Sequence, residues 1–203
     1  MRLRRCGTDA VLVEVDSLDQ VDAVRAAVAA ADIPGLVELV PAARTVLVSV
    51  APGSGGLARL TGVLAAADLS HPPRRAAREV RIPVRYDGPD LELAARTAGL
   101  SVADIVELHS GSEYSVAFTG FAPGFGYLTG LPEALVQARL DRPRTAVPAG
   151  SVGIAGEFTG VYPRSSPGGW RLLGRTELAL FDPHREPPAL PVPGDRVRFE
   201  VVG

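Results

Sequence analysis

The chain has 203 residues, of which 46% are hydrophobic, and it carries a formal net charge of -2 at pH 7. This length and apolar content predict one large or two small globular domains with a real core. The balanced charge, with no basic run longer than an Arg pair in the sequence, argues against a nucleic-acid-binding protein.

No apolar run in the sequence is long enough to span a bilayer, and the first residues lack the apolar core of a signal peptide, so we expect a cytoplasmic protein without membrane contact. The one cysteine, Cys6, is expected to be a small buried hydrophobe. All 21 basic residues are arginine. Within this sequence, the lack of lysine excludes a Walker A lysine, a Schiff-base lysine and a lysine that carries biotin or lipoate, so we expect no covalent cofactor.

The first part of the chain alternates between predicted strands and helices. Apolar runs predict strands at 10–15, 36–40 and 45–50, and apolar spacing predicts one helix after a capping box at Ser17 and another that ends near Leu69. A polar connector, 71–79, leads to an alternating strand at 79–86. The order strand, helix, strand, strand, helix, strand is the ferredoxin-like pattern, which we assign to residues 1–86.

Residues 87–203 have a different character. Two short helices are predicted at 91–98 and 102–108, and five strands follow at 113–119, 151–156, 169–175, 177–181 and 195–202. Many short strands separated by Gly- and Pro-rich turns favour a closed or nearly closed β-barrel. The predicted fold class is therefore α+β.

Three segments, 118–132, 143–156 and 159–176, combine glycine and proline with aromatic, hydroxyl and arginine side chains. This composition disfavours helices and interior strands, because Gly costs backbone entropy and Pro removes a hydrogen-bond donor. We expect shaped loops that together form the rim of one pocket, since binding residues concentrate on loops held by a rigid scaffold.

Longer motifs within and around these segments carry a resemblance to a known family. They are HSGSEY at 109–114, GFAPGFGYL at 120–128, RTAVPAGSVGIAG at 144–156, TGVYP at 159–163, SPGGWRLLGRT at 166–176 and PGDRVRF at 193–199. In this order they resemble the allophanate hydrolase subunit 1 family, which includes the B subunit of bacterial 5-oxoprolinase and an inhibitor of a sporulation histidine kinase. Two positions depart from the family pattern, with Phe158 in place of a frequent Gln and Glu177 in place of a frequent Pro.

The resemblance implies a small N-terminal α/β domain, 1–86, followed by a cyclophilin-like β-barrel domain, 87–203. It also implies the B subunit of an ATP-dependent 5-oxoprolinase, a lactam hydrolase that is inactive alone. Together with two partners, the A subunit plus a larger C subunit, it would cleave 5-oxo-L-proline to L-glutamate, with ATP and Mg²⁺ bound by the complex. Two alternatives stay open: a binding protein that inhibits a sensor histidine kinase, and a carboxyltransferase-like subunit of a urea or allophanate pathway enzyme.

Opening an unreactive lactam requires well-placed donors at its carbonyl or conversion of its oxygen to a leaving group. Arg144 and Arg175 are candidates to bind carboxylate or phosphate, and the alternative is that they form structural ion pairs with Asp141 or Glu177. His109 and Glu113 are spaced for acid/base work, although they also flank the turn that leads to the next strand. The predicted catalytic residues are therefore His109, Glu113 and Arg175.

The remaining predicted site residues share a place in the glycine-rich segments, as backbone donors, hydroxyls or pocket-lining rings. Tyr127 and Tyr162 are expected to line the pocket, and Trp170 is expected in the core. No metal site is predicted. The predicted substrate or phosphate pocket consists of Gly124, Phe125, Gly126, Tyr127, Arg144, Ser151, Gly153, Thr159, Tyr162, Ser166 and Gly168.

Overall fold

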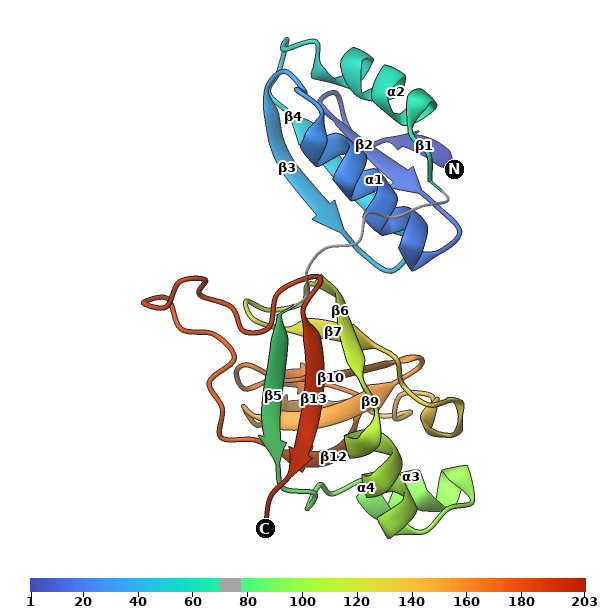
Figure 1. Cartoon of the computed structure of the whole chain (residues 1–203), viewed down its shortest axis with the longest axis vertical. Helices are drawn as coiled ribbons and strands as arrows, with labels where there is room; N and C mark the ends of the chain where they lie inside the picture. Colours follow the sequence, from blue (N-terminus) through green and yellow to red (C-terminus); the bar gives the residue numbers. More distant parts are fainter. Residues whose placement is uncertain (70–77) are drawn as a thin grey trace. The chain divides into compact units, whose positions relative to one another are not determined.

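The computed structural model describes residues 1–69 and 78–203 and divides the chain into two compact units, Met1–Ala76 and Ala77–Gly203 (Figure 1). Each unit has hydrophobic clusters of its own. The polar connector expected at 71–79 lies outside the described residues except for its last two positions. Within residues 1–69 and 78–203, no helix combines the length and apolar content needed to span a bilayer.

The first unit is one antiparallel sheet with two helices, in the strand order β1-β2-β4-β3. Its elements are β1 (Arg2–Arg5), β2 (Ala10–Glu14), α1 (Leu18–Ala30), β3 (Leu36–Pro41), β4 (Thr45–Val50) and α2 (Gly56–Ala66). Helix α1 begins at Leu18 because Ser17 Oγ accepts the Gln20 N–H at 3.3 Å, as the predicted cap requires. Both helices bury apolar side chains against the central strands, which builds the core of the unit.

The ferredoxin-like order holds from β2 to α2, but the strand beside β2 differs from the expectation. That position is taken by β1, the N-terminal strand, and not by the strand predicted at 79–86. All four residues of β1 are exposed, and Cys6, which follows it, is exposed as well. The expectation that Cys6 is buried is therefore wrong, since it directly follows an edge strand at the surface.

The predicted strand at 79–86 exists as β5 (Glu79–Val84), but it belongs to the second unit. It pairs in parallel with β13 (Arg196–Val201) over six residues, and Val80, Ile82 and Val84 pack in a cluster with Val197 and Phe199. The boundary expected after residue 86 thus moves to between Ala76 and Ala77. Burial of the apolar face of β5 in the second core is the physical reason.

The second unit is a seven-stranded sheet in the order β12-β9-β10-β7-β6-β13-β5, with a separate β11-β8 pair. Arg85 and Arg175 exchange two backbone hydrogen bonds of 2.9 Å, which join the ends of the two edge strands β5 and β12. The sheet is therefore a nearly closed barrel, as predicted (Figure 1). Its further elements are α3 (Leu91–Ala98), α4 (Val102–Gly111), β6 (Tyr114–Thr119), β7 (Gly126–Thr129), a 3-10 turn (Glu133–Leu135), β8 (Arg144–Val147), β9 (Ser151–Ala155), β10 (Phe158–Val161), β11 (Ser166–Gly168) and β12 (Arg171–Arg175).

The three glycine-rich segments are only partly loops, because they contribute β7 to β12. Gly153 on β9 pairs with Gly160 on β10. A Cβ on Gly160 would also lie 2.9 Å from the carbonyl oxygen of Gly126, which belongs to the neighbouring strand β7. The glycines thus allow strands to approach closely. Conversely, the strand expected at 177–181 does not form, and only an isolated bridge joins Phe181 to Ala189.

Candidate functional site

The first candidate site is a cavity of about 600 Å³ between the start of α3 and the strands β8, β9 and β12. We call it the arginine cavity, because Arg144 and Arg175 both line it, together with Ser151. Three predicted residues, from two of the motifs, therefore meet at one place. The other lining residues are Asp87, Gly88, Pro89, Ala146, Pro148, Ala149, Leu172 and Gly174.

The two arginines are held in different ways. Arg144 Nη2 lies 2.7 Å from Asp90 Oδ1, and Asp90 Oδ2 accepts the Leu172 N–H at 2.8 Å, so this pair is tied to the backbone of β12. The Asp90 side chain is only 7% exposed and the Arg144 side chain 28%. In contrast, Arg175 Nη2 contacts Asp87 Oδ2 at 2.8 Å with side chains that are 62% and 40% exposed.

These ion pairs correct the partners expected from the sequence, which were Asp141 and Glu177. Asp87 and Asp90 lie on either side of Gly88-Pro89, which in the sequence predicts only the start of a helix. Their role depends on the closure of the barrel, which brings the segment 85–90 against β12. No local sequence signal identifies them.

Gly88 allows this wall of the cavity to form. Its N–H donates to the Leu173 carbonyl at 3.1 Å, and the Asp90 N–H donates to the Leu172 carbonyl at 3.1 Å. A Cβ on Gly88 would lie 2.3 Å from the Leu172 carbonyl oxygen and 2.4 Å from the Leu173 carbonyl carbon. Any side chain at this position would push Asp87 and Asp90 away from the arginines.

A second, aromatic cavity of about 240 Å³ gathers another part of the predicted set: Phe125, Tyr127, Tyr162 and Gly168. Trp170, expected in the core, is buried and also lines this cavity, with its ring perpendicular to that of Phe125 at 5.3 Å. Burial raises the pKa of Tyr162, and the positive charge of Arg139, which sequence reasoning missed, opposes that shift.

The rim of the aromatic cavity is formed by Phe121, whose side chain is 58% exposed and whose φ is 65°. A positive φ is strained for a residue with a bulky side chain. The rings of Phe121 and Phe125 pack in a T-shaped arrangement with their centroids 5.4 Å apart. Phe158, the departure from the family pattern, packs edge-on against Tyr127 at 5.7 Å and extends the aromatic cluster behind the cavity.

His109 lies in neither cavity. Its side chain is fully buried, stacked on Phe199 at 4.6 Å, and burial lowers its pKa from 6.5 to about 3. Thr159 donates its single hydroxyl hydrogen to the Gly153 carbonyl oxygen. Its oxygen can therefore only accept a hydrogen bond from His109, which donates Nε2–H at 2.9 Å. Nδ1 then accepts the hydroxyl hydrogen of Tyr86 at 2.7 Å, which makes His109 a neutral, fully hydrogen-bonded core residue.

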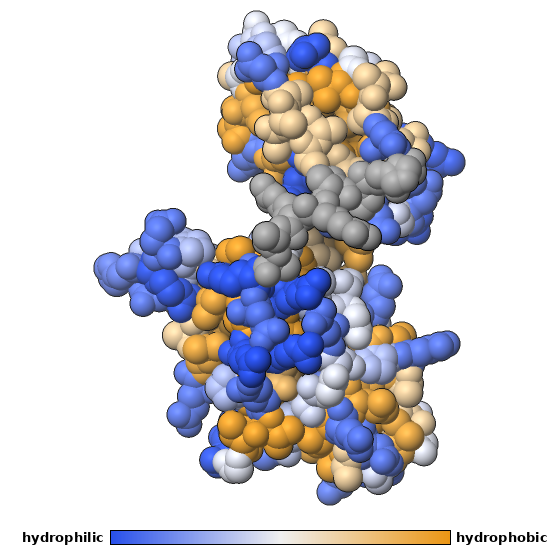
Figure 2. Space-filling model, in the orientation of Figure 1, coloured by the Kyte–Doolittle hydropathy of each residue, from blue (hydrophilic) through white to orange (hydrophobic). Residues whose placement is uncertain are grey.

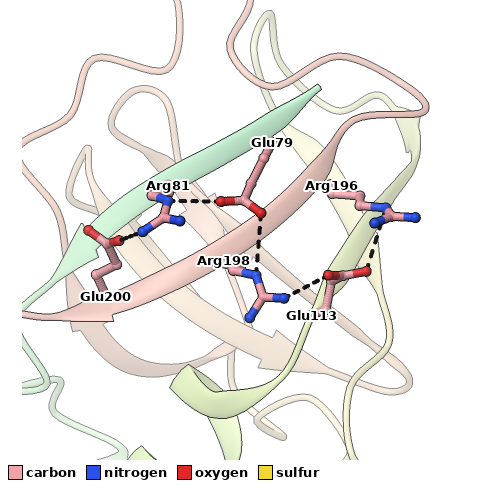
Figure 3. Close-up of polar contacts among 6 residues, drawn as sticks. All are labelled: Glu79, Arg81, Glu113, Arg196, Arg198 and Glu200. Atoms are coloured by element: carbon pink, nitrogen blue, oxygen red, sulfur yellow. Dashed lines mark hydrogen bonds and ion pairs between the residues drawn. The ribbon is translucent and has the colours of Figure 1, made fainter. Parts of the chain in front are cut away.

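Glu113, in contrast to the buried His109, is exposed and belongs to a charged ladder on the outer face of the barrel (Figure 3). Glu113 Oε2 contacts Arg198 Nη2 at 2.8 Å, and Arg198 Nε reaches Glu79 at 3.5 Å. The ladder connects β5, β13 and the start of β6, and Figure 2 shows strongly hydrophilic surface in this region. Its members are Glu79, Arg81, Glu113, Arg196, Arg198 and Glu200.

The structure therefore separates the His109 and Glu113 pair, one into the core and the other onto the surface. Helix α4 ends at Gly111 and β6 starts at Tyr114, so the two residues flank the turn, which is the structural alternative stated above. Tyr114 reinforces this turn, because its hydroxyl donates to the His109 carbonyl at 2.8 Å.

The other predicted pocket residues are spread over the barrel. Thr159 is buried beside His109, Gly126 and Gly153 lie within β7 and β9, Gly124 occupies the turn before β7, and Ser166 starts β11. The expectation of a single pocket rim is thus replaced by two cavities, because short strands divide the glycine-rich segments. Among the described residues, no group of three or more His, Cys, Asp or Glu side chains is placed to hold a metal ion.

Comparison with known proteins places the chain in a family. Residues 1–191 match the family model for the carboxyltransferase domain, subdomain C and D. The chain is 47% identical over 172 residues to the 5-oxoprolinase B subunit of Escherichia coli O157:H7, which covers 83% of this chain and 79% of that protein. It is 50% identical over 125 residues to the 5-oxoprolinase B subunit of Bacillus subtilis (strain 168), which covers 60% of this chain and 52% of that protein.

The fold is shared with a solved structure. The crystal structure of TTHA0988 in space group P6522 superposes with a TM-score of 0.83 at 38% identity over 97% of this chain. The chain spans only 40% of the TTHA0988 chain and about half of the Bacillus relative. These similarities confirm the resemblance found in the motifs: the chain belongs to the family of the carboxyltransferase domain, subdomain C and D, together with the 5-oxoprolinase B subunits.

Proposed function

We propose that this chain is the B subunit of an ATP-dependent 5-oxoprolinase complex, which hydrolyses the C–N bond of the 5-oxo-L-proline lactam to give L-glutamate. An A subunit, with a larger C subunit, completes the complex, and the chain is inactive without them. The observation that carries the proposal is 47% identity over 172 residues to a 5-oxoprolinase B subunit. Because that relative is named as one subunit of an enzyme, its name also supports the proposal that other subunits take part.

The arginine cavity is the proposed place on this chain for the substrate. Arg144 and Arg175 offer cationic hydrogen-bond donors and Ser151 a hydroxyl, while Pro148 and Leu172 supply apolar wall. Small-molecule sites commonly combine an apolar wall with a few convergent polar groups. His109 is proposed as a structural residue in this scheme, because its side chain is buried and both ring nitrogens are engaged.

ATP and Mg²⁺ are assigned to the other subunits. A triphosphate site commonly uses a glycine-rich loop with a lysine, and this sequence has no lysine. Both arginines of the cavity are already paired with carboxylates, Asp87 and Asp90, so the cavity does not provide the excess positive charge that a triphosphate requires. The residues of this cavity therefore do not fit the nucleotide.

Reconstitution tests the proposal. The chain is combined with the A and C subunits of its own organism, and glutamate release from 5-oxoproline is measured with and without ATP. Release that needs ATP and all three subunits is expected. A stable, folded complex that releases no glutamate, while the corresponding Escherichia coli complex does so in the same assay, would refute the proposal.

A further inference from the structure

The guanidinium group of Arg144 is only half satisfied. Its Nη2 binds Asp90, whereas its Nη1 is buried and, within the described residues, lacks a hydrogen-bond partner. A guanidinium group stays charged at all physiological pH values, so Arg144 cannot remove the unpaired Nη1 donor by losing a proton. Buried donors without acceptors are rare in folded proteins, and each one calls for an explanation.

Arg144 nevertheless lines the arginine cavity. Its side chain is 28% exposed, so a ligand can contact its exposed atoms, whereas it reaches the buried Nη1 only if the wall around that atom shifts. The second arginine of the cavity, Arg175, is held by Asp87 in an exposed pair, and exposed pairs of this kind are weak. The cavity thus has one cation anchored through Asp90 and one that can change its partner.

We propose that the arginine cavity is a carboxylate subsite, in which Arg144 is the fixed anchor and Arg175 leaves Asp87 to bind the ligand. Asp90 and Asp87 neutralise the two arginines, so a monoanion meets an unopposed positive charge once Arg175 leaves Asp87. The planar fork of arginine matches the two oxygens of a carboxylate.

The rest of the lining indicates what the acid carries. Pro89, Pro148, Ala149 and Leu172 present apolar surface beside the two guanidinium groups. The ligand class is therefore a monocarboxylic acid with an apolar part beside its carboxylate. This inference rests on the proposed function for 5-oxoproline as the natural acid, but its test requires no catalysis.

The test is a titration of the full-length chain, labelled with ¹⁵N, followed through the backbone amides and the arginine side-chain N–H signals. The probes are 5-oxoproline, cyclopentanecarboxylate, which keeps the acid without the lactam, and 2-pyrrolidone, which keeps the lactam without the acid. We expect saturable shifts of Arg144, Arg175 and Gly88 in the millimolar range with both acids. Equal shifts with 2-pyrrolidone, or none with either acid, would overturn the subsite.

Substitutions sharpen the result. Arg175→Gln is expected to weaken binding of both acids at least tenfold, and Arg144→Gln is expected to weaken it more. The control is Arg142→Gln, which removes the same charge from an exposed position and is expected to bind the acids like the wild type. Asp87→Asn is expected to tighten binding three- to tenfold, because it removes the competitor for Arg175. Misfolding cannot imitate tighter binding, and weaker binding by Asp87→Asn would refute the exchange of partners.

The outcomes separate the two proposals. Acid binding by the chain, combined with a complex that releases no glutamate, keeps the subsite and refutes the enzyme function. A complex that releases glutamate, while Arg144→Gln and Arg175→Gln leave the KM for 5-oxoproline unchanged, keeps the function and refutes the subsite.

Discussion

His109 shows that the environment of a side chain determines its chemical role. A histidine next to a glycine-containing turn is a reasonable acid/base candidate by type. In the folded chain it joins α4 to Tyr86 and β10 through two hydrogen bonds and packs on Phe199. Burial raises the pKa of Tyr86, so its hydroxyl stays protonated and donates to Nδ1 of His109. The network is neutral and closed, which suits a structural role.

We therefore expect His109→Gln to lower the free energy of unfolding by about 2–4 kcal/mol, because it removes a stacked ring and disturbs two buried hydrogen bonds. Urea unfolding followed by circular dichroism measures this. His184→Gln, at an exposed position, is the matched control and is expected to change little. An unchanged midpoint for His109→Gln would contradict the structural role.

The same residue predicts a pH dependence. Its pKa is about 3 in the folded chain and 6.5 without burial, so between these values only the unfolded chain takes up the proton. The contribution of neutral His109 to stability is fully present above pH 6.5 and is lost as pH falls toward 3, by roughly 1.4 kcal/mol per pH unit. The difference in unfolding free energy between wild type and His109→Gln is expected to shrink over this range. A difference that stays constant from pH 7 to pH 4 would contradict the burial of a neutral ring.

At the scale of elements, the segment between β5 and α3 decides the geometry of the arginine cavity. It carries Asp87 and Asp90, and it lies close to β12 because residue 88 has no side chain. The cavity is therefore a product of barrel closure and not of the glycine-rich segments alone. Those segments supply Arg144, Ser151 and Arg175 on β8, β9 and β12.

Gly88→Ala tests this arrangement. The new Cβ would meet the Leu172 carbonyl oxygen at 2.3 Å, so the backbone must move, and we expect a loss of about 2–4 kcal/mol in unfolding free energy. Acid binding at the cavity should weaken at the same time. Gly111→Ala is the control, because its Cβ would meet nothing within 4 Å and the position is helical. Equal stability of the two variants would show that the close approach is not required.

At the scale of the whole molecule, the two units have separate cores, and β5 belongs to the second. This placement predicts that a fragment of residues 77–203 folds alone, while a fragment of residues 87–203 does not. The shorter fragment loses the parallel partner of β13, the apolar side chains of Val80, Ile82 and Val84, and the backbone bridge between Arg85 and Arg175.

Circular dichroism and the dispersion of amide signals in NMR spectra distinguish the two fragments. We expect cooperative unfolding only for residues 77–203. A folded fragment 87–203 would return the boundary to the position that the strand and helix order predicted, with β5 dispensable for the barrel.

Most of the local structure and the family can be predicted from the amino-acid sequence. The periodicity of apolar residues predicted α1, α2, α3, α4 and β13, because an amphipathic face is visible within a short stretch of sequence. The start of α1 was also predictable, because the Ser17 cap is a contact between residues close in sequence. The long motifs identified the family, as the comparisons confirm. Arg144, Ser151 and Arg175 were predicted as site residues because they lie in glycine-rich segments. The structure brings these three residues together in one cavity.

The unit that contains β5 cannot be predicted locally, since an alternating strand of six residues can pair with either sheet until its partners are known. The same holds for His109, whose environment is built by Tyr86, Thr159 and Phe199, all distant in sequence. Asp87 and Asp90 became the partners of the arginines through closure of the barrel. Local pattern records the preferences of a segment, whereas burial, ion pairing and pKa depend on neighbours that only long-range pairing supplies.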